Sequence, residues 1–294
     1  MPELPEVETT KRELEAKVLK RTFVDVWTDT PKIIKKPTNF KEFKKEIQGK
    51  TIKKIWRRGK YIIFELSEDL SLLLHQKLTG HLLVGKWRRK NNEWEPLKKG
   101  PLADKINLFI HLMFWFDNGL MMALSDLRKF AKVELWNTKE LKKAPELENL
   151  GPDPLAKDFS FNDFKELLKN KKGKIKQILM NQEIIAGIGN IYSDEILWRA
   201  KIHPLSEVSK LNEKKLKEIY KVMREVLETA IKLKGESISD YRNINGEKGG
   251  FDKLRKVYRK EGEKCSRCGT LIKKIKMPSG RSSYFCPKCQ KLIK

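Results

Sequence analysis

Four cysteines near the end of the chain have the spacing of a metal site. They form two Cys-x-x-Cys pairs, Cys265 with Cys268 and Cys286 with Cys289, and seventeen residues separate the pairs. This spacing is typical of a tetrahedral zinc site with four thiolate ligands. Because four protein ligands leave no open coordination position, we expect one structural Zn²⁺ ion rather than a catalytic one. A segment this short could hardly fold without the metal.

The start of the chain could supply a nucleophile. Methionine aminopeptidases remove Met1 before a small residue such as Pro2, which would leave a free secondary amine beside Glu3 and Glu6. An α-amino group titrates near a pKa of ~8, so an appreciable fraction is neutral at neutral pH. Amines attack sugar aldehyde carbons to form Schiff bases, and Glu3 could act as the general acid–base. Most chains that begin Met-Pro do no such chemistry, so composition alone does not single out Pro2.

Two other segments could hold phosphate. Gly187-Ile188-Gly189-Asn190 combines a tight turn with the start of a predicted helix, where free backbone N–H groups can grip an anion. Pro278-Ser279-Gly280-Arg281 predicts a hairpin tip that presents Arg281 outward, with three lysines in the strand before it. An ordinary helix–helix turn and a solvated basic loop are the competing interpretations.

The charge of the chain favours a polyanionic partner. Lysine and arginine number 64 against 39 acidic residues, a formal net charge of +25. Such a field attracts nucleic acid, although a lysine-rich proteome would give the same charge. The sequence has no apolar window of membrane-spanning length, and its acidic start lacks the features of a signal peptide. We therefore expect a cytoplasmic protein with no membrane partner.

The first half of the chain predicts a β-rich domain. Residues near 5–19 have helical apolar spacing, and residues from about 22 to 136 predict a sandwich or barrel on which that helix packs. Asn118-Gly119 lies between two apolar runs and predicts a hairpin whose two central residues both have positive φ. The polar, lysine-rich residues 86–105 predict a surface loop.

The second half predicts helices. Gly151-Pro152-Asp153-Pro154 marks the boundary between the domains. Ser160 with Asp163 resembles a capping box, and an apolar stripe over residues 216–230, closed by Gly235, predicts a helix that faces the core. Residues 236–260 predict an irregular loop before the cysteine module.

Three motifs together resemble bacterial formamidopyrimidine-DNA glycosylase. They are the opening residues 1–9, the turn at residues 187–190 and the closing residues 280–290, and the similarity runs over essentially the whole chain. The resemblance implies an α+β protein of two domains. An N-terminal β-sandwich carries the N-terminal helix, and a helix–two-turn–helix domain ends in a four-cysteine zinc-finger hairpin. We place the boundaries at 1–137 for the catalytic domain, 138–158 for the linker, 159–260 for the DNA-binding domain with its lesion-covering loop, and 261–294 for the finger.

The resemblance also implies an activity. It implies a monomeric bacterial enzyme of base-excision repair, associated with the nucleoid, whose partner is damaged double-stranded DNA. Such an enzyme flips an oxidised purine out of the duplex, because a stacked base hides C1′. The terminal amine then attacks C1′, the base leaves, and β,δ-elimination nicks the strand. Pro2 would be the nucleophile and Glu3 the general acid–base. Lys60, grouped with these catalytic residues, would contact a DNA phosphate.

Further residues match the family's DNA contacts. Two kinds of contact are implied: residues that bind the backbone around the lesion, and residues that fill the gap left by the flipped base. The first kind is His75, Lys176, Asn190, Tyr258 and Arg281, and the second is Leu78, Arg128 and Phe130. Ser239 and Tyr241 stand in the loop that would cover the flipped base.

The chain departs from the family pattern near the predicted damage pocket. Residues 75–80 read His-Gln-Lys-Leu-Thr-Gly where the family usually has His-Leu-Gly-Met-Ser-Gly, and Leu127 replaces a proline. Two alternatives to an oxidised-purine glycosylase follow. One is an endonuclease VIII-like glycosylase for oxidised pyrimidines, although that group usually has glycine where this chain has Leu4. The other is a non-catalytic damaged-DNA-binding protein, which predicts the loss of Pro2 or Glu3, yet both are present.

Overall fold

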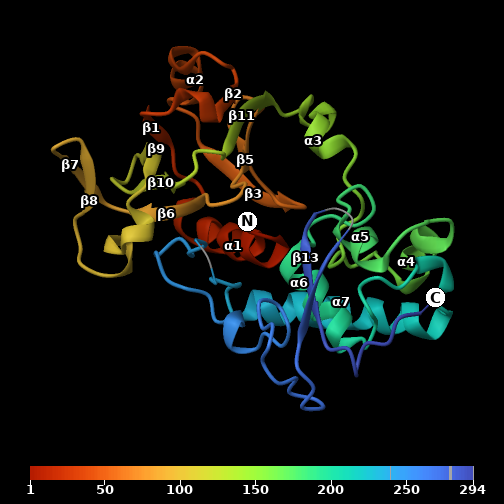
Figure 1. The fold of residues 1–294 in the computed structure, drawn as a ribbon. Coiled ribbons are helices and arrows are strands. Elements are labelled where there is room, and N and C mark those ends of the chain that lie inside the picture. The colour runs from red at the N-terminus through yellow and green to blue at the C-terminus, as the bar shows by residue number, and fades with distance from the viewer. Residues whose placement is uncertain (239, 278–279, 294) are drawn as a thin grey trace. The chain divides into compact units, whose positions relative to one another are not determined.

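The protein is a chain of two structurally distinct halves, seen here in a computed structural model that describes residues 1–238, 240–277 and 280–293. Figure 1 shows most strands in the amino-terminal half and the longest helix, α7 (Glu213–Lys232), in the carboxyl-terminal half. No helix within those three described ranges is long and apolar enough to cross a membrane.

Internal contacts divide the chain into two compact units. The first comprises residues 1–148 and 233–252, and the second comprises residues 149–232 and 253–294. The segment 233–252 thus packs with the amino-terminal half, whereas the predicted boundaries placed it with the helices that precede it. The reason is a set of hydrogen bonds to the first helix, described below.

The first unit is built on two β-sheets that share one apolar core. The four-stranded sheet has the order β1 (Phe23–Thr28), β9 (Ile110–Phe116), β10 (Met121–Ser125) and β6 (His81–Gly85). The five-stranded sheet has the order β2 (Ile34–Lys36), β11 (Lys132–Asn137), β5 (Leu70–His75), β4 (Tyr61–Leu66) and β3 (Ile52–Arg58). Neighbouring strands are antiparallel except β2 and β11, which are parallel. Residues of both sheets belong to one buried cluster, so the predicted sandwich is confirmed.

The first helix belongs to the same core. Helix α1 (Leu4–Val18) lies close to the predicted range of 5–19. Its Val7, Leu14 and Val18 are fully buried in the cluster that the two sheets share. Their helical spacing places them on one face, and that face anchors the start of the chain against the sandwich.

The predicted hairpin between β9 and β10 is confirmed, but its turn differs from the prediction. Gly119 has a φ of +73°, whereas Asn118 is not among the residues with positive φ. The Gly119 N–H donates to the Phe116 carbonyl at 3.0 Å, and the Phe116 N–H donates to the Leu120 carbonyl at 2.9 Å. The expectation of two positive φ angles was wrong, because these bonds close a longer loop in which only its last residue needs the left-handed region.

The prediction of a surface loop over residues 86–105 was also wrong in part. This segment contains a hairpin of β7 (Trp87–Lys90) and β8 (Glu93–Pro96). The Trp94 ring lies 5.1 Å from that of Trp27 and 5.7 Å from that of Trp115, and Trp87 is only 5% exposed. The tryptophans form a small second core on the four-stranded sheet, which outweighs the polar character of the lysines around them.

The second unit is mainly helical. It contains α4 (Phe161–Lys169), α5 (Ile175–Met180), α6 (Asn190–Arg199) and α7, followed by the hairpin strands β12 (Lys273–Lys276) and β13 (Ser282–Phe285). Ser160 and Asp163 form the predicted capping box at the start of α4. The apolar stripe of α7 is buried, which confirms that it is core rather than a binding face.

Short elements complete the described chain. The first unit also contains the α-helices α2 (Phe40–Ile47) and α3 (Pro145–Glu148). Helix α2 reaches the core through Phe43 and Ile47. The 3₁₀ helices of the described ranges are η1 (Pro31–Ile33), η2 (Pro101–Ala103), η3 (Lys105–Asn107), η4 (Leu141–Lys143), η5 (Val208–Lys210) and η6 (Phe251–Lys253).

The segment 233–252 is tied to α1 by Glu6. The Glu6 carboxylate, in a residue 1% exposed, accepts the Glu3 N–H and the Glu236 N–H, each at 2.8 Å. The Tyr241 hydroxyl donates to the Glu6 carbonyl at 3.3 Å. Gly249 folds back so closely that a Cβ there would lie 2.2 Å from the Gly235 carbonyl oxygen.

This close approach predicts the effect of adding one methyl group. Gly249→Ala should destabilise the first unit by about 1–3 kcal/mol, because the backbone at Gly235 must move. Gly250→Ala is the matched control, since the nearest atom to its Cβ would lie at 3.6 Å, an ordinary contact. Thermal unfolding followed by circular dichroism compares the two variants, and equal melting temperatures would contradict the prediction.

Candidate functional site

The start of α1 gathers the groups predicted to do chemistry. Pro2 is buried, Glu3 is 3% exposed and Lys60 is 7% exposed. The amino group of residue 1 interacts electrostatically with three carboxylates and one ammonium group, those of Glu3, Glu6, Asp240 and Lys60. Burial lowers the pKa of this amino group below its ordinary value, although the three carboxylates raise it. The amino group of residue 1 is therefore neutral to a greater extent at neutral pH than an exposed one.

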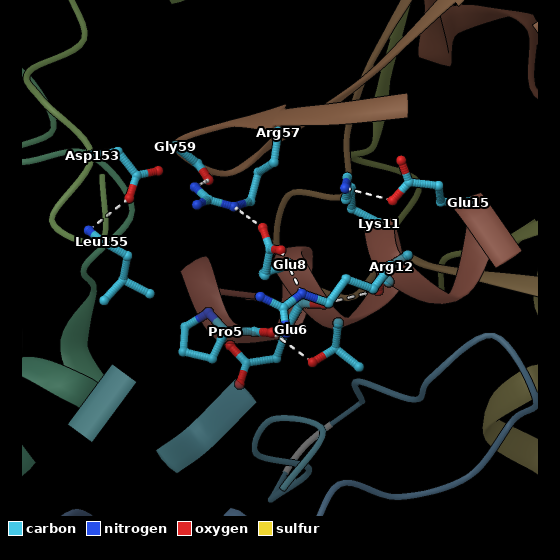
Figure 2. Close-up of polar contacts among 12 residues, drawn as sticks. Pro5, Glu6, Glu8, Lys11, Arg12, Glu15, Arg57, Gly59, Asp153 and Leu155 are labelled. Atoms are coloured by element: carbon cyan, nitrogen blue, oxygen red, sulfur yellow. Dashed lines mark hydrogen bonds and ion pairs between the residues drawn. The ribbon is translucent and has the colours of Figure 1, made fainter. Parts of the chain in front are cut away.

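The turn that carries Lys60 is fastened to α1. Gly59 has a φ of +55°, which lets β3 reverse into β4. Figure 2 shows Arg57 between this turn and α1. Arg57 donates to the Gly59 carbonyl at 3.0 Å and to the Glu8 carboxylate of α1 at 2.9 Å. Burial alone would raise the pKa of Glu8, but the hydrogen bonds and charges of Arg57 and Arg12 outweigh it and lower this pKa. The ionised pair fixes the turn of Lys60 to the helix that begins with the candidate nucleophile.

His75 ends β5 and is only 8% exposed. Burial, reinforced by the charges of Lys77, Lys60 and Lys132, lowers its pKa to about 3, so the imidazole is neutral at pH 7. Its Nδ1 accepts the Lys77 N–H at 2.8 Å. The proton is therefore on Nε2, which can donate to an anionic oxygen.

Asp126 joins the loops that carry the predicted gap-filling residues. This residue is 1% exposed, and its carboxylate accepts the Thr79 hydroxyl. It also accepts the backbone N–H groups of Arg128 at 3.3 Å, Phe130 at 2.7 Å and Ala131 at 2.8 Å. A carboxylate with this many donors holds both loops in one geometry.

The three predicted gap-filling side chains lie on these loops. Leu78 is 38% exposed and Phe130 is 51% exposed. The Arg128 guanidinium lies 4.9 Å from the centroid of the Phe130 ring. The structure therefore brings Arg128 and Phe130 together at the surface of the first unit, on loops joined to the one that carries Leu78.

In the second unit, the glycine turn before α6 is held by a glutamine. Gln182 accepts the Gly187 N–H at 2.9 Å and donates to the Ile188 carbonyl at 2.8 Å. Gly187 has a φ of +98°, so a glycine is needed there. Asn190 begins α6, and its side-chain oxygen is buried and has no hydrogen-bond partner within the described residues.

Lys176 is not a surface cation. Its side chain is 1% exposed, and its ammonium donates to the Asp194 carboxylate at 2.7 Å and to the Ser282 carbonyl at 3.2 Å. The same carboxylate accepts the Ser283 hydroxyl at 2.6 Å and the Tyr284 N–H at 3.0 Å. Burial raises the pKa of Asp194 to about 6 despite these donors, so it remains mostly ionised at pH 7. This buried cluster fastens β13 to α5 and α6.

Arg281 stands at the start of the strand that this cluster holds. It is exposed, and it lines a cavity of about 250 Å³ together with Lys176, Gln177, Met180, Asn181 and Met277. The predicted hairpin of β12 and β13 is confirmed, while its predicted tip residues 278 and 279 lie outside the described residues. Ser239 of the predicted covering loop likewise lies outside them.

Tyr258 is held by a second buried carboxylate. It is 9% exposed, and its N–H donates to Glu195 at 3.0 Å, beside the N–H groups of Lys256 and Val257. Burial raises the pKa of Glu195, against these three backbone donors. The Tyr258 ring lies 5.4 Å from that of Tyr284 on β13.

The four cysteines converge as predicted. The sulfur atoms of Cys265, Cys268, Cys286 and Cys289 all lie within 4.8 Å of one another, and each belongs to a free cysteine. Two of the sulfur–sulfur contacts are 3.4 Å, too long for a disulfide. Four sulfur donors around one point form a closed metal site of the kind that zinc prefers.

Asp126, Asp194 and Glu195 were not predicted as site residues, although each orients one. For two of them the sequence offered only the adjacent acids Asp194 and Glu195 within a predicted helix, where a solvated face would be the ordinary expectation. The residues that bind these carboxylates are distant in the sequence, so the sequence could not predict which residues they are.

Comparison with known protein families covers most of the chain. Residues 1–133 match the model described as the formamidopyrimidine-DNA glycosylase N-terminal domain, and residues 150–242 match the H2TH domain of the same glycosylase. Residues 262–292 match the zinc finger found in this glycosylase and in an isoleucyl-tRNA synthetase. These three matches follow the order of the predicted modules.

Similar whole proteins are also known. The chain is 37% identical to formamidopyrimidine-DNA glycosylase of Lactobacillus gasseri, with 100% of both chains covered. It is 40% identical to that of Lactococcus lactis subsp. cremoris, with 99% of both covered. Among solved structures, it is similar to a mutant of the Lactococcus lactis glycosylase bound to Fapy-dG containing DNA. The sequence identity is 38%, the TM-score is 0.85, and the match covers 99% of this chain and 100% of that one. The Lactococcus lactis protein bound to abasic-site DNA has the same identity and TM-score, with coverage of 98% and 99%.

The buried pair in the second unit carries a prediction. Asp194→Asn leaves the Lys176 ammonium buried beside a neutral amide, and should destabilise this unit by about 3–5 kcal/mol. Limited proteolysis should then cut β12 and β13 faster. Glu213→Gln is the control, since it breaks the surface pair of Lys165 and Glu213. If both variants unfold at the wild-type temperature, the cluster does not hold the hairpin.

Proposed function

The chain belongs to the formamidopyrimidine-DNA glycosylase family, and from that premise we propose that it excises oxidised purines and then nicks the strand as an AP lyase. The substrate would be 8-oxoguanine or a formamidopyrimidine in damaged double-stranded DNA. The observation that carries the proposal is the buried environment at the start of α1. There Pro2 and Glu3 are buried, and the Met1 amino group next to them interacts with the charges of Glu3, Glu6 and Lys60.

The chemistry follows from these groups. After removal of Met1, the Pro2 nitrogen would use its lone pair to form a bond to C1′ of the flipped nucleotide. The electrons of the C1′–base bond leave with the base, which must gain a proton. The Pro2 nitrogen would then lose its proton, and the C1′–O4′ bond would break as O4′ gains a proton, which opens the sugar ring and forms an iminium between that nitrogen and C1′. Because the amine is secondary, this iminium is permanently charged, and it draws electrons from the C2′–H bond as a proton leaves C2′. The 3′ phosphate and then the 5′ phosphate depart in the successive eliminations.

Glu3 is the proposed proton carrier for these steps. It is buried next to the amine, so its carboxyl group can exchange protons with the sugar rather than with bulk solvent. Lys60 would bind the phosphate beside the lesion. The neutral His75 would donate its Nε2 proton to another phosphate oxygen.

The remaining DNA contacts are proposed from position and chemistry. Asn190, Tyr258 and Arg281 would bind the backbone, while Leu78, Arg128 and Phe130 would fill the space vacated by the flipped base. Lys176 is proposed to act indirectly, because its ammonium is committed to Asp194 beneath the cavity that Arg281 lines. Tyr241 is proposed to support the covering loop rather than to touch the base, because it is 5% exposed and bound to Glu6.

We also propose that the four-cysteine site binds one Zn²⁺ ion. All four donors are sulfur, their mutual distances suit a single ion, and no ligand position is left for substrate. The ion would stabilise the fold of the finger. The packing of Arg267 over the Trp198 ring, 4.1 Å from its centroid, then joins that finger to the end of α6.

Blocking the amine tests the lyase. On a duplex with an abasic site, borohydride should trap the mature protein as a covalent adduct. Protein that retains Met1 should form none, yet should bind an uncleavable abasic duplex within about twofold of the mature protein. Full trapping by protein that mass spectrometry shows to retain Met1 would refute the role of Pro2.

A second variant separates the roles of the two residues. Glu3→Gln should lower base excision from an 8-oxoguanine duplex by about 10²–10⁴-fold, because the proton carrier is lost. Glu15→Gln, at the far end of α1, is the control and should excise normally. A lesion panel of 8-oxoguanine, formamidopyrimidine and thymine glycol duplexes tests the substrate class, and preference for thymine glycol would favour the endonuclease VIII-like alternative.

Removing one metal ligand tests the zinc site. Elemental analysis should find about one zinc per wild-type chain and a large loss in Cys286→Ser. DNA affinity should fall with it, because Arg281 lies in the same hairpin. A variant that keeps stoichiometric zinc or wild-type DNA affinity would contradict this assignment.

A further inference from the structure

Several exposed apolar side chains lie on adjoining loops of the first unit. Leu108 is 44% exposed, Phe109 is 37% exposed and Leu127 is 49% exposed. With Leu78 and Phe130, these make five of the eleven large apolar residues that are substantially exposed in the described chain. Contiguous exposed apolar surface on a water-soluble unit marks a place where something binds.

Asp126 joins the three loops that carry these residues. The Asp126 N–H donates to the Phe109 carbonyl at 2.8 Å, so the loop before β9 lies against the turn after β10. The Asp126 carboxylate accepts the Thr79 hydroxyl and thereby joins the loop of Leu78. One buried residue thus binds three loops, and each loop presents at least one exposed apolar side chain.

The charges around this surface suit a polyanion. The three loops, residues 76–80, 104–109 and 126–131, contain four basic side chains and two acidic ones. One of the acids, Asp126, is 1% exposed and surrounded by donors, so Asp104 alone adds negative charge at the surface of these loops. The basic side chains are Lys77, Lys105, Arg128 and Lys129.

We propose that Leu108, Phe109 and Leu127 form an apolar shelf that holds a DNA base left unstacked beside the flipped nucleotide. The inference rests on the proposed function, which requires the duplex to be opened at this unit. Opening exposes the faces of neighbouring bases, and an aromatic ring with aliphatic neighbours can cover such a face whatever the base is. The basic rim holds the phosphates that flank that base.

The shelf is distinct from the predicted gap-filling residues. Leu78, Arg128 and Phe130 would enter the vacated space, whereas the shelf residues come from the loop before β9 and from position 127. Leu127 stands where the family usually has proline, and its exposed side chain adds apolar surface to the shelf. A base held on the shelf would make opening of the duplex less costly.

Equilibrium binding to an uncleavable duplex tests the shelf. The probe is a duplex with a tetrahydrofuran abasic analogue, and 2-aminopurine in the opposite strand reports unstacking by its fluorescence. Phe109→Ala should weaken binding by roughly fivefold to a hundredfold and reduce the fluorescence rise. Leu127→Ala should act in the same direction but less strongly. Affinity for an intact duplex should stay within about twofold, because phosphate contacts are unchanged.

The control is Val24→Ala, which removes an equally exposed apolar side chain on β1, 48% exposed. Wild-type binding and fluorescence by both shelf variants would overturn the proposal. If those variants instead abolish a self-association of the wild type seen by sedimentation, the surface is an interface between copies, and the proposal is equally refuted.

Failure of the proposed function would look different. The tetrahydrofuran analogue cannot form a Schiff base, so binding to it does not depend on Pro2 or Glu3. Wild-type protein that gives no borohydride adduct, yet loses affinity when Phe109 is replaced, would refute the lyase and support the shelf.

Discussion

The carboxylate of Glu6 is the constraint on which the candidate active site depends. Its two oxygens accept one N–H from the start of the chain and one from the segment 233–252, more than two hundred residues later. Water cannot substitute, because the residue is almost completely buried. The same contact therefore sets the direction in which residue 2 leaves α1 and brings Asp240 near the amine. A nucleophile at a chain terminus would otherwise be mobile, and its chemistry requires a fixed geometry.

Buried carboxylates that accept several hydrogen bonds recur elsewhere in this basic protein. Asp126, Asp194 and Glu195 are each 1% exposed or less, and each accepts several hydrogen bonds from loops or strands distant in sequence. Burying a carboxylate is costly unless donors satisfy it, so each position specifies one local geometry. As a result, part of the negative charge of the protein is buried. Lysines and arginines dominate what remains outside, which suits a polyanionic partner.

This pattern explains which features the sequence could predict. Helix α1, the Ser160 cap, the stripe of α7 and the cysteine cluster depend on residues a few positions apart, so periodicity and spacing predict them. The buried carboxylates could not be predicted in this way, because Asp194 meets Ser283 and Glu6 meets Glu236 only in the folded chain. Lys176 illustrates the difficulty: a lysine in a basic sequence is ordinarily a surface charge, and its burial depends on a partner eighteen residues away. The tryptophans of β7 and β8 were missed because polar neighbours masked two short strands.

The loop of residues 75–80 shows how the fold accommodates a departure from the family pattern. Lys77 occupies the position where the family usually has glycine, and its φ is +54°. This conformation costs a non-glycine residue roughly 1–2 kcal/mol, so something local must offset it. The Lys77 N–H bond to His75 Nδ1 does so, and it also fixes the tautomer of a histidine whose pKa the nearby ammonium helps to lower. Gly80 is retained, since a Cβ there would lie 2.4 Å from the Gln76 carbonyl oxygen. Lys77 therefore adopts a conformation that glycine would take without strain, and it adds a cation to the loop next to Leu78.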